Sequence, residues 1–212
     1  MIKNLLFDLG GVIMNIRRQN CVDAFVKLGL RDADSLLGEY SQAGVFAGIE
    51  NGSLTPAEFH AEIRSHIGHE VSDEAIDHAF GCFLTGIPQH RLRELEALHG
   101  RYGIYMLSNT NPIMWADGIR RNFEADGHDV DYYFDGIVRS YKAHAMKPDE
   151  RIFRAVIDRY GLDPHETLFL DDSQTNLDAA ARLGFRTLLV PPGEEFYDLL
   201  SRYPGFEMPV RD

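Results

Sequence analysis

The sequence predicts an α/β fold in which a parallel sheet is sandwiched by helices and carries an inserted helical cap subdomain. Three observations support this prediction. Short apolar runs recur along the chain and each ends in polar or turn residues, helical patterns separate the later runs, and residues 15–85 hold helix signals without a convincing strand. Strands that alternate with helices form βαβ units, whose helices cover both faces of a parallel sheet.

The expected strands are four short apolar runs, namely Ile2–Phe7, Gly103–Leu107, Thr167–Leu170 and Arg186–Val190. Their apolar character along the whole run is typical of strands buried on both faces. The expected helices are Gln89–Leu98, Pro148–Tyr160 and Asn176–Leu183, which are followed by Gly100, Gly161 and Gly184. Glycine at or just beyond the end of a helical pattern is a common C-terminal stop, so we expect these helices to end there.

Residues 15–85 differ in character from the rest of the chain. Thr55-Pro56-Ala57-Glu58 matches a capping box with proline at the first helical position, and Ser72-Asp73-Glu74-Ala75 is a second helix start. We therefore expect a helical cap over 15–85, inserted into a catalytic core formed by 1–14 and 86–212. The alternative is one continuous α/β domain with a helical flank.

Composition and charge restrict the classes of partner. The 212 residues carry 21 Lys+Arg against 33 Asp+Glu, a net charge of −12. This charge repels phosphate backbones and anionic lipid surfaces, so we expect neither nucleic-acid nor membrane binding. Only Cys21 and Cys82 occur, and the first residues do not form a signal-peptide pattern. We therefore expect a reduced, cytoplasmic protein.

The residues that follow the expected strands are the candidates for chemistry, because ligands of open parallel sheets bind beyond the carboxyl ends of the strands. Asp8 follows the first strand, Ser108-Asn109-Thr110 follows the second, and Asp171-Asp172-Ser173 follows the third. Lys147 lies ahead of a helix. Carboxylates, a hydroxyl, an amide and a lysine would thus gather at one edge of the sheet.

These residues stand in four motifs, FDLGGV (Phe7–Val12), LSNT (Leu107–Thr110), MKPD (Met146–Asp149) and FLDDSQTN (Phe169–Asn176). In this order and at these strand ends they resemble the motifs of the haloacid dehalogenase-like (HAD) hydrolase superfamily, helical-cap subfamily. The resemblance covers the whole chain. Within the family, the chain resembles α-D-glucose-1-phosphate-type phosphatases. The resemblance implies a Rossmann-like core and a Mg²⁺-dependent phosphatase that acts on a small phosphorylated metabolite, such as a sugar phosphate.

The resemblance also implies a role for each motif residue. Asp8 would attack phosphorus and form an aspartyl-phosphate. Asp8, Asp172 and the backbone carbonyl of Gly10 would hold Mg²⁺, which prefers oxygen ligands. The residues that would bind the phosphate oxygens are Ser108, the backbone amide of Asn109, and Lys147. The residues that would support the site from behind are Asp171, which holds the loop or Lys147, and Asn176, which stands where the family often has an acid.

Gly10 departs from the pattern of most family phosphatases, which carry a general acid/base aspartate at this position. Loss of such a group typically costs about 10²–10⁴ in rate. Three outcomes stay open: a substrate with a good leaving group such as a sugar 1-phosphate, a replacement acid from the cap, or a slow or inactive enzyme. Glucose-1-phosphate-type relatives share the glycine, which favours the first. The third would make the chain a phosphate-binding or regulatory protein.

Substrate specificity should come from the cap. Tyr40, Phe46, Glu50 and Asn51 lie in a segment that could face the site. His144 stands where the family often has glycine three residues before the lysine, and we expect it on the surface. A phospho-receiver domain uses a similar set of residues, but the order of the motifs and the length of 212 residues argue against it. The sequence names neither the substrate nor the oligomeric state.

Overall fold

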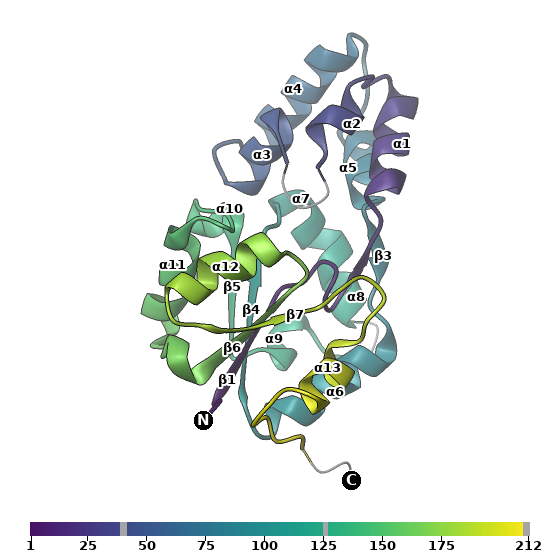
Figure 1. Cartoon of the computed structure of the whole chain (residues 1–212). Helices are drawn as coiled ribbons and strands as arrows, with labels where there is room; N and C mark the ends of the chain where they lie inside the picture. The colour runs from purple at the N-terminus through teal and green to yellow at the C-terminus, as the bar shows by residue number, and fades with distance from the viewer. Residues whose placement is uncertain (39–41, 125–126, 210–212) are drawn as a thin grey trace.

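A parallel sheet of five strands, in the order β5-β4-β1-β6-β7, forms the centre of the computed structural model, which describes residues 1–38, 42–124 and 127–209 (Figure 1). The strands are β1 (Asn4–Phe7), β4 (Gly103–Ser108), β5 (Gly136–Arg139), β6 (Thr167–Asp171) and β7 (Arg186–Leu189). The predicted fold class is confirmed. No sequence pattern predicted β5, which lies at one edge of the sheet and pairs with β4.

Alternate residues of the central strand face opposite sides of the sheet, as the period of a strand requires. Leu5 and Phe7 belong to one apolar cluster, in which the rings of Phe7 and Phe196 lie 5.2 Å apart. Leu6 belongs to the other cluster, together with Phe153 and Leu177. Both faces are therefore covered, which explains why the strands are apolar throughout.

Helices cover each face of the sheet. The cluster around Leu5 and Phe7 includes side chains of α6 (Gln89–His99) and α13 (Phe196–Ser201), whereas the cluster around Leu6 includes those of α11 (Glu150–Tyr160) and α12 (Gln174–Arg182). The remaining elements of this part are α7 (Pro112–Met114), the π-helix η1 (Trp115–Ile119), α8 (Arg120–Glu124), α9 (Val130–Tyr133), α10 (Ser140–Ala143) and the 3₁₀ helix η2 (Pro164–Glu166).

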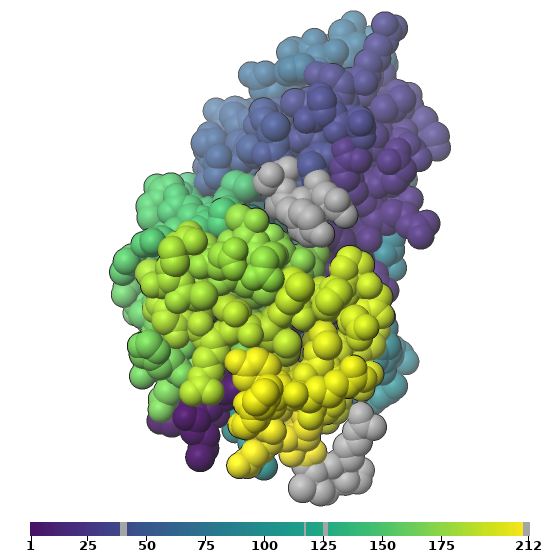
Figure 2. Space-filling model, viewed as in Figure 1, coloured from purple at the N-terminus to yellow at the C-terminus, as the bar shows by residue number. Residues whose placement is uncertain are grey.

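In the described residues between Ile16 and Leu84, five helices lie together over one end of the sheet, where Figures 1 and 2 show them in purple and blue. They are α1 (Arg18–Leu28), α2 (Ala33–Leu36), α3 (Gly44–Glu50), α4 (Pro56–Ile67) and α5 (Asp73–Gly81). The predicted capping box of Thr55 and Glu58 and the Ser72 cap are both formed. The rings of Phe25, Phe46 and Phe80 pack against one another with centroids 5.1–6.1 Å apart.

A short antiparallel pair of strands, β2 (Asn15–Ile16) and β3 (Leu84–Gly86), lies where the chain enters and leaves this helical segment. The sequence does not predict these strands, because runs of two or three residues carry no periodic pattern. The pairing brings the entering and the leaving chain side by side.

Within the described ranges, no helix is both long enough and apolar enough to cross a lipid bilayer.

Candidate active site

One pocket collects the polar residues that follow the strands. Because β1 pairs in parallel register with both β4 and β6, the carboxyl ends of these strands coincide. Of the predicted site residues, those that line the pocket are Asp8, Gly10, Ser108, Asn109, Lys147, Asp172 and Asn176. Asp171 does not line it and lies fully buried behind it. The structure therefore brings together the residues of all four motifs.

Lys147 connects two of the carboxylates. Its Nζ lies 2.8 Å from Oδ1 of Asp8 and 2.7 Å from Oδ2 of Asp171. Burial lowers the pKa of Lys147, but the charges of Asp171 and Asp8 outweigh burial, so that the pKa lies above its ordinary value. Lys147 is therefore a fixed positive charge at the floor of the pocket.

Asp171 uses both of its oxygens within the protein. Oδ1 accepts hydrogen bonds from the backbone amide of Ser173 and from Nδ2 of Asn176, both at 2.9 Å, while Oδ2 faces Lys147. A carboxylate held in this way orients its neighbours. Asp171 thus holds the loop, Asn176 and Lys147 at once.

Asp8 is the carboxylate that faces both Lys147 and the pocket. Its Oδ1 also accepts a 2.6 Å hydrogen bond from the backbone amide of Leu9. Burial is the main reason that the pKa of Asp8 is raised to about 8; the charge of Lys147 opposes this shift, and the charges of Asp171 and Asp172 contribute to it. A positive charge added beside Asp8 and Asp172 would favour the ionised form that can act as a nucleophile.

Asn109 fastens the loop after β4 to the loop that carries Lys147. Its Nδ2 donates to the carbonyl of Lys147 at 3.0 Å, and its Oδ1 accepts from the amide of Lys147 at 2.8 Å. Ser108, which ends β4, is 2% exposed, and its hydroxyl contacts the carbonyl of Asn109 at 3.4 Å. The side chain of Asn109 is thus occupied by the loop.

The donor set fits a hard divalent cation. One carboxylate oxygen from each of Asp8, Asp171 and Asp172 lies within 4.8 Å of the others. Asp8 and Asp172 line the pocket, whereas Asp171 lies behind it and accepts hydrogen bonds from protein donors. Oxygen ligands of this kind, few in number and beside an open pocket, suit Mg²⁺.

The two glycines after Asp8 differ in what the fold asks of them. A Cβ on Gly11, whose φ is +77°, would lie 2.2 Å from Oδ2 of Asp172, so this position must be glycine. A Cβ on Gly10 would meet only Ile16, at 3.4 Å, which is ordinary contact distance. The backbone therefore does not require glycine at position 10. With glycine there, no side chain reaches the pocket from this position.

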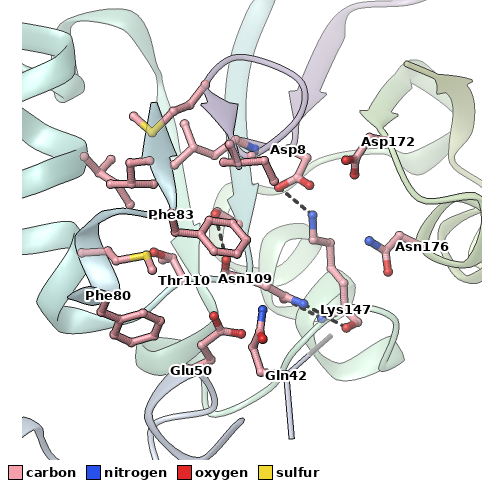
Figure 3. Close-up of a pocket in the computed structure, with 18 residues that line it drawn as sticks. Asp8, Gln42, Glu50, Phe80, Phe83, Asn109, Thr110, Lys147, Asp172 and Asn176 are labelled. Carbon is pink, nitrogen blue, oxygen red and sulfur yellow. Dashed lines mark hydrogen bonds and ion pairs between the residues drawn. The ribbon is translucent and has the colours of Figure 1, made fainter. Parts of the chain in front are cut away.

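The cap side of the pocket includes one of the four residues singled out from the sequence. Glu50 lines the pocket, Phe46 is buried among cap side chains, Asn51 does not line the pocket, and Tyr40 lies outside the described residues. Sequence reasoning missed Gln42, which lines the pocket close to Glu50 (Figure 3). No sequence pattern could have identified Gln42, because its position depends on how the cap packs.

His144 is exposed and does not line the pocket. It follows α10 with a φ of +50°, in the left-handed region that favours glycine. The expectation of a surface histidine is confirmed.

The chain is similar to known enzymes over nearly its whole length. It is 36% identical to the D-ribitol-5-phosphate phosphatase of Bacteroides thetaiotaomicron, over 95% of this chain and 98% of that protein. A HAD family enzyme from the same organism, solved in complex with magnesium and inorganic phosphate, superposes with a TM-score of 0.88 and 40% identity, and the match covers 94% of this chain and 99% of that one.

A HAD-like family hydrolase from Porphyromonas gingivalis superposes with a TM-score of 0.89 and 33% identity, over 95% of this chain and 97% of that one. The family profile of haloacid dehalogenase-like hydrolases matches residues 2–184. Together with the four motifs and their meeting in one pocket, these similarities show that the chain belongs to the haloacid dehalogenase-like hydrolase family.

Proposed function

We propose that the protein is a Mg²⁺-dependent phosphatase that hydrolyses a small phosphorylated metabolite, a sugar or polyol phosphate. The observation that carries this proposal is the position of Lys147 Nζ, 2.8 Å from Asp8 in a pocket that also holds Asp172. A nucleophile, a fixed cation and further carboxylates in one pocket suit phosphoryl transfer, which requires positioning and neutralisation of charge. The phosphatase activity of the relative from Bacteroides supports the same conclusion.

Asp8 is the nucleophile in this proposal. A carboxylate oxygen of Asp8 forms a bond to phosphorus while the bond from phosphorus to the ester oxygen breaks, and the departing oxygen takes a proton from water and leaves as the alcohol. Water then attacks the aspartyl-phosphate and releases inorganic phosphate together with the regenerated carboxylate. Ser108, the amide of Asn109 and Lys147 bind the phosphate oxygens.

Asp8, Asp172 and the carbonyl of Gly10 would hold Mg²⁺. The ion, when bound, neutralises charge on the phosphate oxygens and favours the ionised form of Asp8. Asp171 and Asn176 orient Lys147 and the loop from behind. Within this proposal, residues 1–14 and 86–212 supply the chemistry and residues 15–85 form the cap that covers it.

Asp8→Asn tests the mechanism. The variant keeps the shape of the side chain but removes the nucleophile, so turnover of ribitol 5-phosphate and glucose 1-phosphate should fall by at least about 10³-fold. Phosphate release is measured with and without Mg²⁺. Asp178→Asn, an exposed aspartate of α12, is the control. Turnover without metal, or turnover that survives in Asp8→Asn, would contradict the mechanism.

A second candidate function is phosphate binding without catalysis, which the missing side chain at Gly10 favours. Calorimetric binding of phosphate esters without turnover across sugar phosphates and nucleotides would support it. Turnover that depends on Asp8 would exclude it.

A further inference from the structure

The pocket has a second polar side, which the proposed chemistry does not use. It consists of Glu50 at the end of α3, Gln42 just before α3, and Thr110 after β4, and all three line the pocket. Figure 3 shows Glu50 and Gln42 next to each other, on the side of the pocket away from Asp8 and Asp172. We call these three residues the distal cluster.

Polar atoms of the distal cluster lack protein partners. Glu50 is only 7% exposed, and its carboxyl forms no hydrogen bond or ion pair with the described part of the chain. Oε1 of Gln42 and Oγ1 of Thr110 are likewise buried without a hydrogen-bond partner among the described residues. Leaving a buried polar group unsatisfied costs about 1–3 kcal/mol. Such atoms, gathered in one pocket, indicate a ligand that supplies their partners.

The chemistry of the cluster indicates which ligand groups these are. Burial raises the pKa of Glu50 to about 8, so that at neutral pH its carboxyl is largely protonated and both donates and accepts. Gln42 and Thr110 are neutral groups that also donate and accept. A hydroxyl has the same dual character, whereas an ammonium group only donates and would need an ionised carboxylate. Phe80 and Phe83 offer apolar surface for the carbon chain.

We propose that Glu50, with Gln42 and Thr110, forms a subsite that binds hydroxyl groups on the organic part of the substrate and selects hydroxylated phosphate esters. The proposal rests on the proposed function, because it assumes that the phosphate group of the ester lies at Asp8 and Lys147. Glu50 is then a specificity-determining residue, and the class of substrate is a polyol or sugar phosphate.

The test compares two esters of equal chain length, ribitol 5-phosphate and n-pentyl phosphate. Glu50→Leu should lower the ratio of their kcat/KM values by about 10²-fold, because the hydroxyls lose a buried partner. Glu50→Gln keeps a donor and an acceptor and should lower it by about tenfold or less. The loss should be mainly in KM, since the contact is made before and during the reaction. Glu62→Gln, an exposed glutamate of the cap, is the control.

Two outcomes of the kinetic comparison would overturn the proposal. In the first, Glu50→Leu loses activity equally on both esters, which would give Glu50 a role in folding or chemistry. In the second, the wild-type enzyme prefers O-phosphoethanolamine and loses that preference in Glu50→Gln, which would make the subsite specific for cations.

A binding measurement separates this proposal from the proposed function. Calorimetry on Asp8→Asn protein with Mg²⁺ should show that ribitol 5-phosphate binds more tightly than n-pentyl phosphate, and that Glu50→Leu in the same background removes most of this difference. If wild type turns over neither ester but this pattern holds, the phosphatase function fails and the subsite stands. Equal binding of the two esters to the Asp8→Asn protein would overturn the subsite.

Discussion

At the scale of single residues, the clearest prediction concerns the effect on kcat of adding a side chain at Gly10. A Cβ is tolerated there, since it would meet only Ile16, at 3.4 Å. Gly10→Asp should therefore raise kcat about 10–100-fold on esters with poor leaving groups such as n-pentyl phosphate, because a positioned acid protonates the departing oxygen. p-Nitrophenyl phosphate, whose leaving group needs no proton, should gain less than threefold by the same argument.

Gly10→Asn controls for the size of the added side chain, because it cannot supply the proton. An equal gain in the Asn variant would show that packing around Ile16 is responsible. No gain in Gly10→Asp would indicate that another group already protonates the leaving oxygen.

Glu50 predicts a pH dependence of stability. Its pKa lies near 8 in the folded protein against an ordinary value of 4.5. Between these pH values the unfolded chain releases a proton that the folded protein keeps, so the free energy of unfolding falls as pH rises. Relative to Glu50→Gln, wild type should lose up to about 1.4 kcal/mol per pH unit in this window and nothing more above it. Urea denaturation at pH 5, 6, 7 and 8 measures the difference; parallel profiles would contradict the burial of an unpaired carboxyl.

At the scale of elements, the turn after α3 packs closely against α10 and so positions the cap on the core. Gly52 has a φ of +76°, and a Cβ there would lie 2.3 Å from the carbonyl oxygen of Tyr141 in α10 and 2.9 Å from Nδ1 of His144. Because the obstacle includes backbone, Gly52→Ala should lift the turn away from α10. Glu50 lies two residues earlier, so the substrate should bind less well and kcat/KM on ribitol 5-phosphate should fall at least about tenfold.

Gly68→Ala is the matched control for this substitution. Gly68 ends α4 in the same cap with a φ of +79°, and a Cβ there has no atom within 4 Å. Both variants bear the backbone cost of a left-handed alanine, about 1–2 kcal/mol, but only Gly52→Ala adds a clash with the core. Equal activities of the two variants would show that the position of the cap does not depend on the contact between this turn and α10.

The elements that could be predicted from the sequence are those with a local signature. The apolar runs predicted β1, β4, β6 and β7, and the capping patterns predicted where α4 and α5 begin. β5 has only four residues at the sheet edge, and β2 and β3 have two and three, which is too short for a period to show.

The site divides in the same way. Residues at strand ends could be predicted because parallel topology alone brings them together. Gln42 and Glu50 line the pocket, whereas Phe46 and Asn51 do not. This difference depends on how the cap helices are rotated against the core, which no local pattern encodes.

At the scale of the whole molecule, the metal should couple to stability. A cation that binds only the folded protein stabilises it by about 2.7 kcal/mol at a hundred times its Kd. For a chain of 212 residues this corresponds to a rise in Tm of roughly 5–10 °C. Thermal melts in EDTA and in Mg²⁺ measure the shift.

Asp172→Asn should abolish most of that shift, whereas Asp178→Asn, exposed on α12, should keep it. A shift that survives in Asp172→Asn would place the metal elsewhere. The net charge of −12 does not conflict with an anionic substrate, because Lys147 and a bound cation would set the local field in the pocket.

The pairing of β2 with β3 has a consequence for how such proteins diversify. Because the entering and leaving strands are hydrogen-bonded neighbours, the segment between them leaves the chain and rejoins it at one place, as a surface loop does. Lengthening a loop whose ends already meet adds only a slowly growing entropic cost. A change in the helices between these two strands therefore need not disturb the five-stranded sheet, at whose strand ends Asp8 and Asp172 lie.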